Sequence, residues 1–359
     1  MKKLSIGLGL LMCLFLLYGG FLSVKGKIKR DVMRPVNSDV SPSVSPTPIV
    51  IHDTEEKQSV FIPYWAIPSS QAAIDEDTVV YFGVTPNTSS VNRNEEGYRN
   101  LATFLKRTKT KKKILTLRMI DPEVNTSVLS HVNAQKQIAT DIARLAKENG
   151  FSGVLLDLEL SAIPLDSVVT QISSFTKKIS SEVKSEKLSF SVAIYGDTFY
   201  RVRPYDIKAI ATVSDSLSIM SYDFHKARGN PGPNFPLHGK ERYEYDMEKM
   251  VDDFLRFVPG EKLTIVFGLY GYDWVVDEKG KMVEQGSPMT TTQVNAFLKR
   301  CQTCKVTRDA LSSESKITYT LNGKNHVIWY EDFSSVEKKK VFLRTKGINS
   351  FSYWAYSYY

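Results

Sequence analysis

The sequence predicts an α/β protein: a closed (β/α)8 TIM barrel with a small α+β insertion between its seventh and eighth strands. Eight short β-branched and aromatic runs alternate with helical stretches over about 300 residues, as parallel β/α units require. An open doubly wound sheet usually carries a glycine-rich phosphate turn near its first strand, and this sequence has none. The closed barrel therefore accounts for the pattern better.

The eight expected strands are rich in Val, Ile, Leu, Phe and Tyr. They cover 59–65, 78–84, 112–119, 151–159, 187–195, 215–223, 262–270 and 348–356. Helical patterns lie between them, at 134–150, 166–184 and 245–260. The first helical pattern ends in Asn149-Gly150 and the last in Pro259-Gly260, which are typical helix stops.

One long segment, residues 275–333, does not follow this alternation. It contains "KITYTLNGKNHVIWYEDF", in which "TLNGKN" between two strand-like runs predicts a hairpin turn. We expect 275–333 to form the insertion, on the rim where the barrel strands have their carboxyl ends. Residues 59–359 are then one barrel domain that includes the insertion.

The formal net charge of +8 is concentrated at the N-terminus. Residues 1–35 hold seven basic residues and one acidic residue, which gives 7 − 1 = +6. The remainder holds 40 basic and 38 acidic residues, or +2. A nearly neutral body excludes a general polyanion-binding role, so we expect no nucleic-acid partner.

The N-terminal segment, residues 1–30, is expected to be a membrane anchor or a signal segment. Leu4 to Val24 is an apolar run of 21 residues behind two lysines, long enough to span a bilayer. Only a poor small-x-small cleavage pattern follows it, which favours an uncleaved anchor over a signal peptide. The domain is then membrane-anchored outside the cytoplasm, or secreted if the segment is cleaved. The positive charges that follow the run argue for the opposite orientation.

The stretch between the anchor and the barrel, residues 31–58, is rich in Ser, Pro and Thr. Such a composition cannot bury a core and predicts a flexible linker.

Cysteine and histidine usage does not predict a metal site. Cys301 and Cys304 form a lone "CQTC", whereas a structural zinc needs four ligands, so a local disulfide or two free thiols are favoured. His225 and His238 lie thirteen residues apart with no third ligand, which favours loop or subsite contacts. No metal and no cofactor are expected.

An acid pair closes the fourth expected strand, in "FSGVLLDLEL". Asp157 and Glu159 are two residues apart and therefore share one face of the strand. The carboxyl ends of the strands are where catalytic groups lie in this fold. Strand ends also finish on acids that face solvent or pair with a lysine, and the pattern of this strand alone leaves the two interpretations equal.

The ends of other strands add residues that suit a carbohydrate site. They are Met220, Tyr222 and Asp223 in "MSYDF", with Tyr64, Tyr270 and Trp354 at the ends of strands one, seven and eight. Aromatic faces pack on sugar rings, while carboxylates meet hydroxyls and the glycosidic oxygen. Each aromatic taken singly is more often part of the core. Their joint placement at strand ends favours a binding site.

The motifs on these strands resemble those of the family 18 glycoside hydrolases, the chitinase-like barrels, and most closely the spore-germination and peptidoglycan-acting branch. The family's DGxDxDxE signature appears as "SGVLLDLE" at 152–159. Gly153, Asp157 and Glu159 are kept, while Ser152 and Leu155 replace the first two acids.

Further motifs extend the resemblance over about residues 59–359. They are "MSYD", "PGP" at 231–233, "GLYGYDW", "VIWYEDFSSVEKK" and the strand-eight tryptophan, Trp354.

The resemblance implies a retaining hydrolysis of β-1,4 linkages next to N-acetylglucosamine, in peptidoglycan or a chitin-like glycan, assisted by the substrate's 2-acetamido group. Glu159 would be the general acid, and Asp157 would hold the acetamido N–H. Tyr222 would hydrogen-bond the acetamido oxygen, Asp223 would contact the same sugar, and Trp354 would form the floor of the subsite. Leu155 removes the acid that partners Asp157 in chitinases.

Two other functions compete with this one. A non-catalytic glycan-binding barrel would keep the pocket without the chemistry. Retention of Glu159 favours the enzyme, because chitinase-like lectins usually lose that acid. A barrel enzyme of unrelated chemistry, such as a phosphate-binding lyase, is disfavoured by the missing phosphate loop. We expect the protein to act as a monomer.

Overall fold

The computed structural model describes residues 55–67, 74, 76–110, 112–160 and 162–359. The predicted anchor, and the linker as far as residue 54, lie outside the described residues. The barrel begins at Lys57, two residues before the predicted start.

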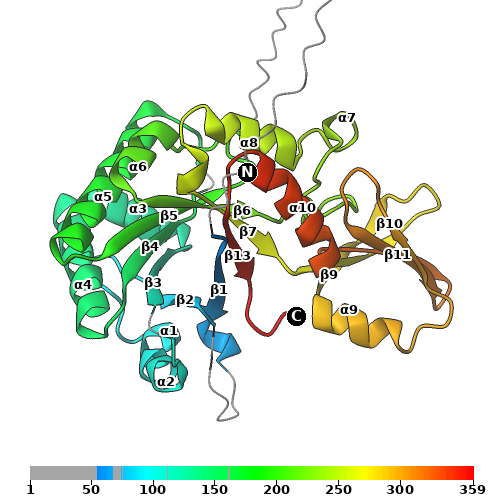
Figure 1. Ribbon diagram of the computed structural model, residues 1–359, viewed down its shortest axis with the longest axis horizontal. Helices are drawn as coiled ribbons and strands as arrows, with labels where there is room; N and C mark the ends of the chain where they lie inside the picture. The colour runs from blue at the N-terminus through cyan, green and yellow to red at the C-terminus, as the bar shows by residue number, and fades with distance from the viewer. Residues whose placement is uncertain (1–54, 68–73, 75, 111, 161) are drawn as a thin grey trace, which may run out of the picture. The chain divides into compact units, whose positions relative to one another are not determined.

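Eight parallel strands close into a barrel in the order β1-β13-β7-β6-β5-β4-β3-β2, which confirms the predicted fold class (Figure 1). The strands are β1 (Lys57–Pro63), β2 (Thr78–Val84), β3 (Lys112–Met119), β4 (Gly153–Leu158), β5 (Ser189–Tyr195), β6 (Ser216–Ser221), β7 (Leu263–Gly268) and β13 (Ser350–Trp354). Seven of the eight runs expected from the sequence contain one of these strands, and the run 59–65 overlaps β1, which begins at Lys57.

Helices connect successive strands and, apart from the short helix Lys240–Tyr243, which contacts the insertion, cover the outside of the barrel. They are α1 (Glu96–Arg99), α2 (Leu101–Arg107), α3 (Pro122–Ser130), α4 (Val132–Glu148), α5 (Asp166–Ser185), α6 (Ile207–Val213), α7 (Lys240–Tyr243), α8 (Met247–Leu255) and α10 (Phe333–Thr345). In α4, Ile138, Ile142 and Ala146 recur at a spacing of four residues and form a buried stripe. The helix stops as predicted, because Gly150 takes a left-handed φ of 66° after Asn149.

The strands are apolar on both faces because both faces are buried. On β4, Val154 and Leu156 belong to the core between the barrel and its helices, whereas Leu155 belongs to a second apolar cluster. That cluster joins side chains from six barrel strands, so they meet inside the barrel; Phe61, Val80, Val266 and Leu155 are among them. Asp157, two residues after Leu155, therefore points into the same interior.

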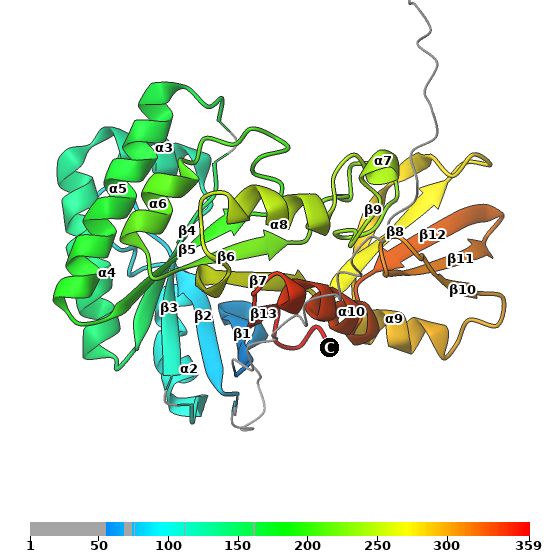
Figure 2. The ribbon, with the colours of Figure 1, turned by 45° about the horizontal axis from the view of Figure 1, so that its top comes forward.

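The insertion is a five-stranded antiparallel sheet with one helix, in the strand order β10-β11-β12-β8-β9. Its elements are β8 (Tyr270–Val276), β9 (Met282–Thr290), α9 (Thr291–Leu298), β10 (Lys305–Arg308), β11 (Ser315–Leu321) and β12 (Lys324–Tyr330). Figures 1 and 2 show this sheet on the side of the barrel where β7 and β13 lie, with α10 beside it. The predicted hairpin is confirmed: Asn322 and Gly323, with φ of 51° and 74°, connect β11 to β12.

The boundary between barrel and insertion lies earlier than predicted. β7 ends at Gly268, so the predicted strand 262–270 is too long, and Tyr270 begins β8 instead. Tyr270 pairs with Thr290 of β9, five residues before the predicted start of the insertion at 275. The aromatic run "GLYGYDW" continues across both strands, so its composition did not mark where the parallel ladder ends.

The segment that follows α9 carries a disulfide. Cys301 and Cys304 are bonded, with their Cα atoms 5.6 Å apart, which confirms the disulfide rather than the free-thiol alternative. Among the helices of the described part of the chain, none combines the length and the apolar composition needed to cross a bilayer.

Candidate active site

The main chain around Glu159 is fixed from two sides. Glu159 follows β4 directly, and its N–H donates to the Met119 carbonyl at 2.8 Å. The side chain of Asn125, buried in α3, donates to the carbonyls of both Met119 and Glu159, at 2.8 and 2.9 Å. On the other side, the Tyr205 hydroxyl donates to the Leu158 carbonyl at 2.7 Å. The Glu159 side chain therefore leaves a rigid point of the barrel rim.

The Glu159 carboxylate accepts a hydrogen bond from Tyr195, the last residue of β5. The hydroxyl lies 2.5 Å from Oε2. Burial, together with the Glu159 carboxylate, raises the pKa of Tyr195, so the phenol remains a donor. Arg203 stacks 3.7 Å from the centre of the Tyr195 ring and donates twice to Asp197, at 2.6 and 3.0 Å. Tyr195 and its support orient the general-acid candidate.

A pocket of about 60 Å³ joins the ends of β4, β5 and β6. Glu159, Met220, Tyr222 and Asp223 line it, together with Tyr195 and the exposed Lys226. The structure thus brings together four residues that the sequence singled out. Tyr195 was missed, although it ends the expected strand 187–195 in the same way as the residues that were selected.

Asp157 lies below this pocket and is 2% exposed. Its Oδ1 has no hydrogen-bond partner among the described residues. Burial raises the pKa of Asp157 well above its usual value, the Glu159 charge raises it further, and Arg118 lowers it. The Asp157 carboxyl group therefore keeps a proton more readily than a free aspartate does.

Arg118 on β3 is a charged neighbour that the sequence did not single out. It is the register partner of Asp157 on β4, and 7% of it is exposed. Its guanidinium lies 4.9 Å from the Phe82 ring and 5.4 Å from the Tyr64 ring, and one nitrogen is 3.9 Å from Glu95. The alternation of side chains along strand 112–119 places this arginine on the inner face of the barrel. That position could have identified Arg118 from the sequence.

Aromatic side chains line the β1, β2 and β13 side of the rim. Trp354 stacks on Tyr222 at a ring distance of 6.3 Å and meets Trp65 edge-on at the same distance. Trp65 is 50% exposed, whereas its neighbour Tyr64 is half-buried against it and Arg118. The exposed ring next to Trp354 is therefore Trp65, and the sequence analysis selected Tyr64 instead.

Tyr270 reaches the site through Asp223. Its hydroxyl donates to Asp223 Oδ1 at 2.5 Å, and the hydroxyl of Tyr272 donates to the same oxygen at 2.8 Å. Tyr270 is 8% exposed, so its ring is packed rather than presented to a ligand. Tyr270 therefore contributes to the site by holding the Asp223 carboxylate.

Comparison with known proteins identifies the family. Residues 52–358 match the sequence model of the "Glycosyl hydrolases family 18". The chain belongs to this family. The family 18 assignment agrees with the barrel, the acid pair on β4 and the Tyr222-Asp223 pair after β6.

Individual relatives are distant. The cortical fragment-lytic enzyme of Bacillus anthracis is 24% identical over 242 residues, which cover 65% of this chain and 52% of that protein. The uncharacterized glycosylase YvbX of Bacillus subtilis is 24% identical over 244 residues, covering 66% of each. The chain thus spans about half to two thirds of the length of these curated relatives.

A solved family 18 structure shares the fold. The chitinase of Cycas revoluta, determined in complex with (GlcNAc)3, superposes with a TM-score of 0.72 at 18% identity. The match covers 83% of this chain and 94% of that one.

Leu155, the departure from the family 18 signature, is 2% exposed inside the barrel. It packs with Phe61, Val80 and Val266, so an acid at this position would have apolar neighbours. The Asp157 carboxyl group therefore has the cationic side chain of Arg118 beside it, on β3, and the apolar side chain of Leu155 below it.

The two histidines make loop contacts. His225 Nδ1 lies 2.8 Å from the Pro233 carbonyl, and burial lowers the pKa of this imidazole. His238 Nδ1 lies 3.2 Å from a carboxylate oxygen of Glu248. Among the residues described, no group of three His, Cys, Asp or Glu side chains is placed to hold a metal ion.

Proposed function

We propose that this protein is a retaining glycoside hydrolase that cleaves β-1,4 linkages next to N-acetylglucosamine. The observation that carries the proposal is that Glu159 and Tyr222 line one pocket above the buried Asp157, in a family 18 chain. The names of its relatives, a cortical fragment-lytic enzyme and a chitinase bound to (GlcNAc)3, support a glycan that contains N-acetylglucosamine.

In the proposed reaction the substrate supplies its own nucleophile. Glu159 protonates the glycosidic oxygen as the bond to the leaving sugar breaks. The carbonyl oxygen of the 2-acetamido group attacks the anomeric carbon and forms an oxazolinium-like intermediate, which water then opens with Glu159 acting as base. Asp157 accepts the acetamido N–H and orients the group. Two displacements at the anomeric carbon retain its configuration.

The electrostatics of the acid pair support this division of roles. The raised pKa of Asp157 means that this buried carboxyl group holds a proton beside the Glu159 carboxylate at a pH where a free aspartate would be ionised. A substrate that brings an N–H donor to Asp157 stabilises the ionised form of Asp157, so binding of the acetamido group favours loss of that proton.

Tyr222 and the tryptophans complete the proposed sugar subsite. Burial, together with the charges of Asp157 and Glu159, raises the pKa of Tyr222 well above its usual value, so its hydroxyl remains a donor for the acetamido oxygen. Trp354 stacks with Tyr222 and forms the floor, while the exposed ring of Trp65 extends the aromatic surface away from the acid pair.

The test compares the full-length protein with Glu159→Gln on N-acetylchitooligosaccharides and on purified peptidoglycan. We expect wild-type turnover of at least one of these glycans, and a fall in kcat of about 100-fold or more in the variant, the usual worth of a general acid. Substrate binding is expected to persist in the variant, because glutamine keeps the shape of the side chain. Equal turnover by both proteins would contradict the role of Glu159.

A glycan-binding barrel without catalysis is the second candidate, and Leu155 is the observation that favours it. The apolar cluster around Leu155 leaves Asp157 without the acid that partners it in chitinases. Binding of both glycans by wild type, without turnover and without a difference in the Glu159→Gln variant, would establish this alternative.

We propose that the domain acts outside the cytoplasm, as a monomer, anchored by residues 1–30 or secreted after their removal. The apolar run behind Lys2 and Lys3 supports export, as does the Cys301–Cys304 disulfide, because disulfides persist in oxidising compartments. Added protease is then expected to degrade the domain on intact cells. Protection of the domain until the cells are lysed would contradict this location.

A further inference from the structure

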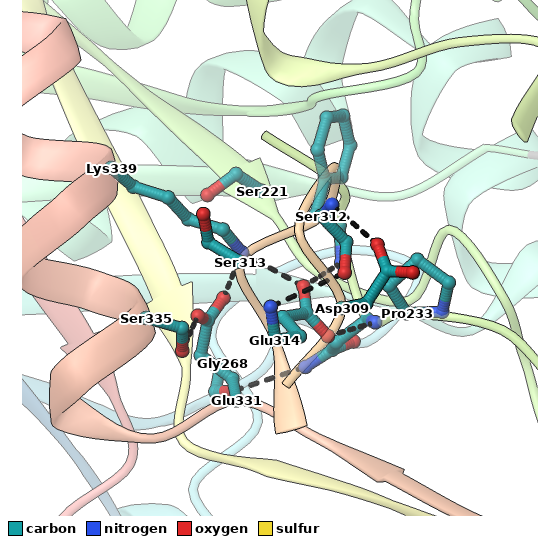
Figure 3. Close-up of polar contacts among 12 residues, drawn as sticks. Ser221, Pro233, Gly268, Asp309, Ser312, Ser313, Glu314, Glu331, Ser335 and Lys339 are labelled. Atoms are coloured by element: carbon teal, nitrogen blue, oxygen red, sulfur yellow. Dashed lines mark hydrogen bonds and ion pairs between the residues drawn. The ribbon is translucent and has the colours of Figure 1, made fainter. Parts of the chain in front are cut away.

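Three buried charged side chains connect the insertion to the last helix of the barrel. Glu314, Glu331 and Lys339 are each 0% exposed. Lys339 Nζ lies 2.8 Å from Glu314 Oε1 and 2.5 Å from Glu331 Oε2, and Figure 3 shows it reaching from α10 between the two carboxylates. Burying ions costs free energy unless each is paired and hydrogen-bonded, so such a cluster requires a structural or functional reason.

The other hydrogen bonds of the Glu314 carboxylate, one to each of its oxygens, indicate that reason. Glu314 precedes β11, and its carboxylate accepts the N–H groups of Asn234 and Phe235 at 2.5 and 2.8 Å. These two residues belong to the loop that leaves β6 and follows the "PGP" at 231–233. The insertion therefore holds the main chain of a loop that comes from the barrel.

Asn234 passes this constraint on to the site. Its side chain is buried, with Oδ1 accepting the N–H of Asp223 at 2.7 Å. Its Nδ2 donates to the carbonyls of Gly268 and Tyr270, at 3.0 and 3.2 Å. One N–H donor and two carbonyl acceptors fix which end of the amide is oxygen, so the orientation of Asn234 follows from chemistry.

Asp223 needs this support because its backbone is unusual. Its φ is +57°, in the left-handed region that non-glycine residues rarely adopt. Its carboxylate is held by Tyr270 and Tyr272 of β8, so the insertion also fixes the other end of the residue. Both contacts keep Asp223 at the pocket that it shares with Glu159.

We propose that Asn234, locked by Glu314 of the insertion, is the positioning residue for Asp223. The insertion then helps to form the active site. It positions the Asp223 carboxylate through the hydroxyls of Tyr270 and Tyr272, and it positions the Asp223 main chain through Asn234. This proposal rests on the proposed function only for the role of Asp223 in binding the sugar.

A double-mutant cycle on kcat/KM tests the proposal in the full-length protein. Asn234→Ala removes the acceptor of the Asp223 N–H and is expected to lower kcat/KM about tenfold or more. Because Asn234 acts through Asp223, the double variant with Asp223→Ala is expected to be no slower than Asp223→Ala alone. If the loss of kcat/KM in the double variant equals the product of the losses in the two single variants, the proposal is overturned.

Ser335→Ala is the matched control for general destabilisation. Ser335 is buried on α10 and hydrogen-bonds Glu331, at the far end of the same cluster and away from the pocket. We expect this variant to lower the Tm and leave kcat/KM unchanged. If it lowers kcat/KM as much as Asn234→Ala for the same loss of Tm, the effect is one of stability and the positioning role is wrong.

Crystal structures of wild type and Asn234→Ala decide the question without relying on activity. We expect Asp223 to leave its left-handed φ and to lose the Tyr270 and Tyr272 hydrogen bonds in the variant. An unchanged Asp223 would overturn the proposal. A wild type that does not turn over glycans would instead defeat the proposed function and leave this comparison valid.

Should Asn234→Ala not fold, the crystal structure and the kcat/KM of Asn234→Asp test the proposal instead. This variant keeps an oxygen for the Asp223 N–H and loses the donors to Gly268 and Tyr270. We expect it to keep the φ of Asp223 and at least half of the wild-type kcat/KM. Loss of the Asp223 position with the acceptor still present would contradict the proposal.

Discussion

Leu155 shows how a single residue shapes the chemistry expected of this site. It fills the barrel below Asp157 with apolar volume, so no carboxyl group there can share a proton with Asp157. The remaining charged neighbours that shift the pKa of Asp157 are Glu159, which raises it, and Arg118, which lowers it. The ionisation of Asp157 therefore depends on a cation from β3.

Arg118→Met is predicted to move the pH–rate profile to higher pH. Removing the cation removes an influence that lowers the pKa of Asp157, so Asp157 holds its proton to a higher pH. The measurement is kcat/KM between pH 4 and 9. A shift to lower pH, or no shift, would show that Arg118 does not set the ionisation of Asp157.

Lys226→Met is the control for this profile. Lys226 also lines the pocket, but it is exposed and is not among the charges that shift the pKa of Asp157. We expect its substitution to leave the position of the pH profile unchanged, even where the rate falls.

Asp157→Asn is predicted to stabilise the fold as pH rises above 4. The pKa of Asp157 is raised on folding, so the native state binds its proton more tightly than the unfolded chain, whose carboxyl group titrates near 3.8. Wild-type stability from this group is present below pH 3.8 and is lost as pH rises towards the raised value. The Tm difference between variant and wild type is expected to be larger at pH 7 than at pH 4, and a difference independent of pH would contradict this prediction.

At the scale of elements, the contact between α10 and the insertion depends on a protonated glutamate. Burial raises the pKa of Glu331 to about 8, and the Glu314 charge adds to this effect while Lys339 opposes it. The neighbouring carboxylates raise the pKa of Lys339, so the lysine stays charged. One cation thus serves two carboxyl groups, and the cluster is neutral when Glu331 keeps its proton.

Glu331→Gln is predicted to make stability less dependent on pH between 5 and 8. The folded-state pKa of about 8 lies above the ordinary value of 4.5, so the native state binds the proton more tightly and wild type loses stability as pH rises through this window. At pH 7 the free energy of unfolding of wild type is expected to be lower than at acidic pH by on the order of 3 kcal/mol, at about 1.4 kcal/mol per pKa unit.

Thermal unfolding of both proteins at pH 5 and pH 8 checks this prediction. Glutamine keeps an oxygen for Lys339 and does not titrate. We expect the Tm of the variant minus that of wild type to increase from pH 5 to pH 8. A difference that stays constant or decreases over this range would mean that Glu331 is ionised in the folded protein.

At the scale of the whole molecule, the barrel could be predicted from sequence because each strand is a local signal. The runs at 78–84 and 112–119 coincide with β2 and β3, since parallel strands buried on both faces read as continuous apolar stretches. The "NG" turn fixed the hairpin of the insertion for an equally local reason. The boundary at Tyr270 was missed because it depends on which strand pairs with which.

The site was predictable where its residues lie at strand ends and hidden where they act through other residues. Asp157, Glu159 and Tyr222 were selected because several strand ends and the family motifs pointed to them together, although each strand alone left their role open. The inner-face position of Arg118 could be read from its strand, but its contact with Asp157 could not, and neither could the role of Asn234 in a loop that folds back from β6. Such contacts join residues far apart in sequence, and no local pattern reports them.

The central claim is that Glu159 and Asp157 still support substrate-assisted, retaining hydrolysis with Leu155 below them. The most direct test follows, by proton NMR, the anomeric configuration of the first product released from an N-acetylchitooligosaccharide by the full-length protein. We expect the β-anomer to appear first and then to equilibrate, and Glu159→Gln to release it at least about 100-fold more slowly. Initial release of the α-anomer, or equal rates for the two proteins, would contradict it.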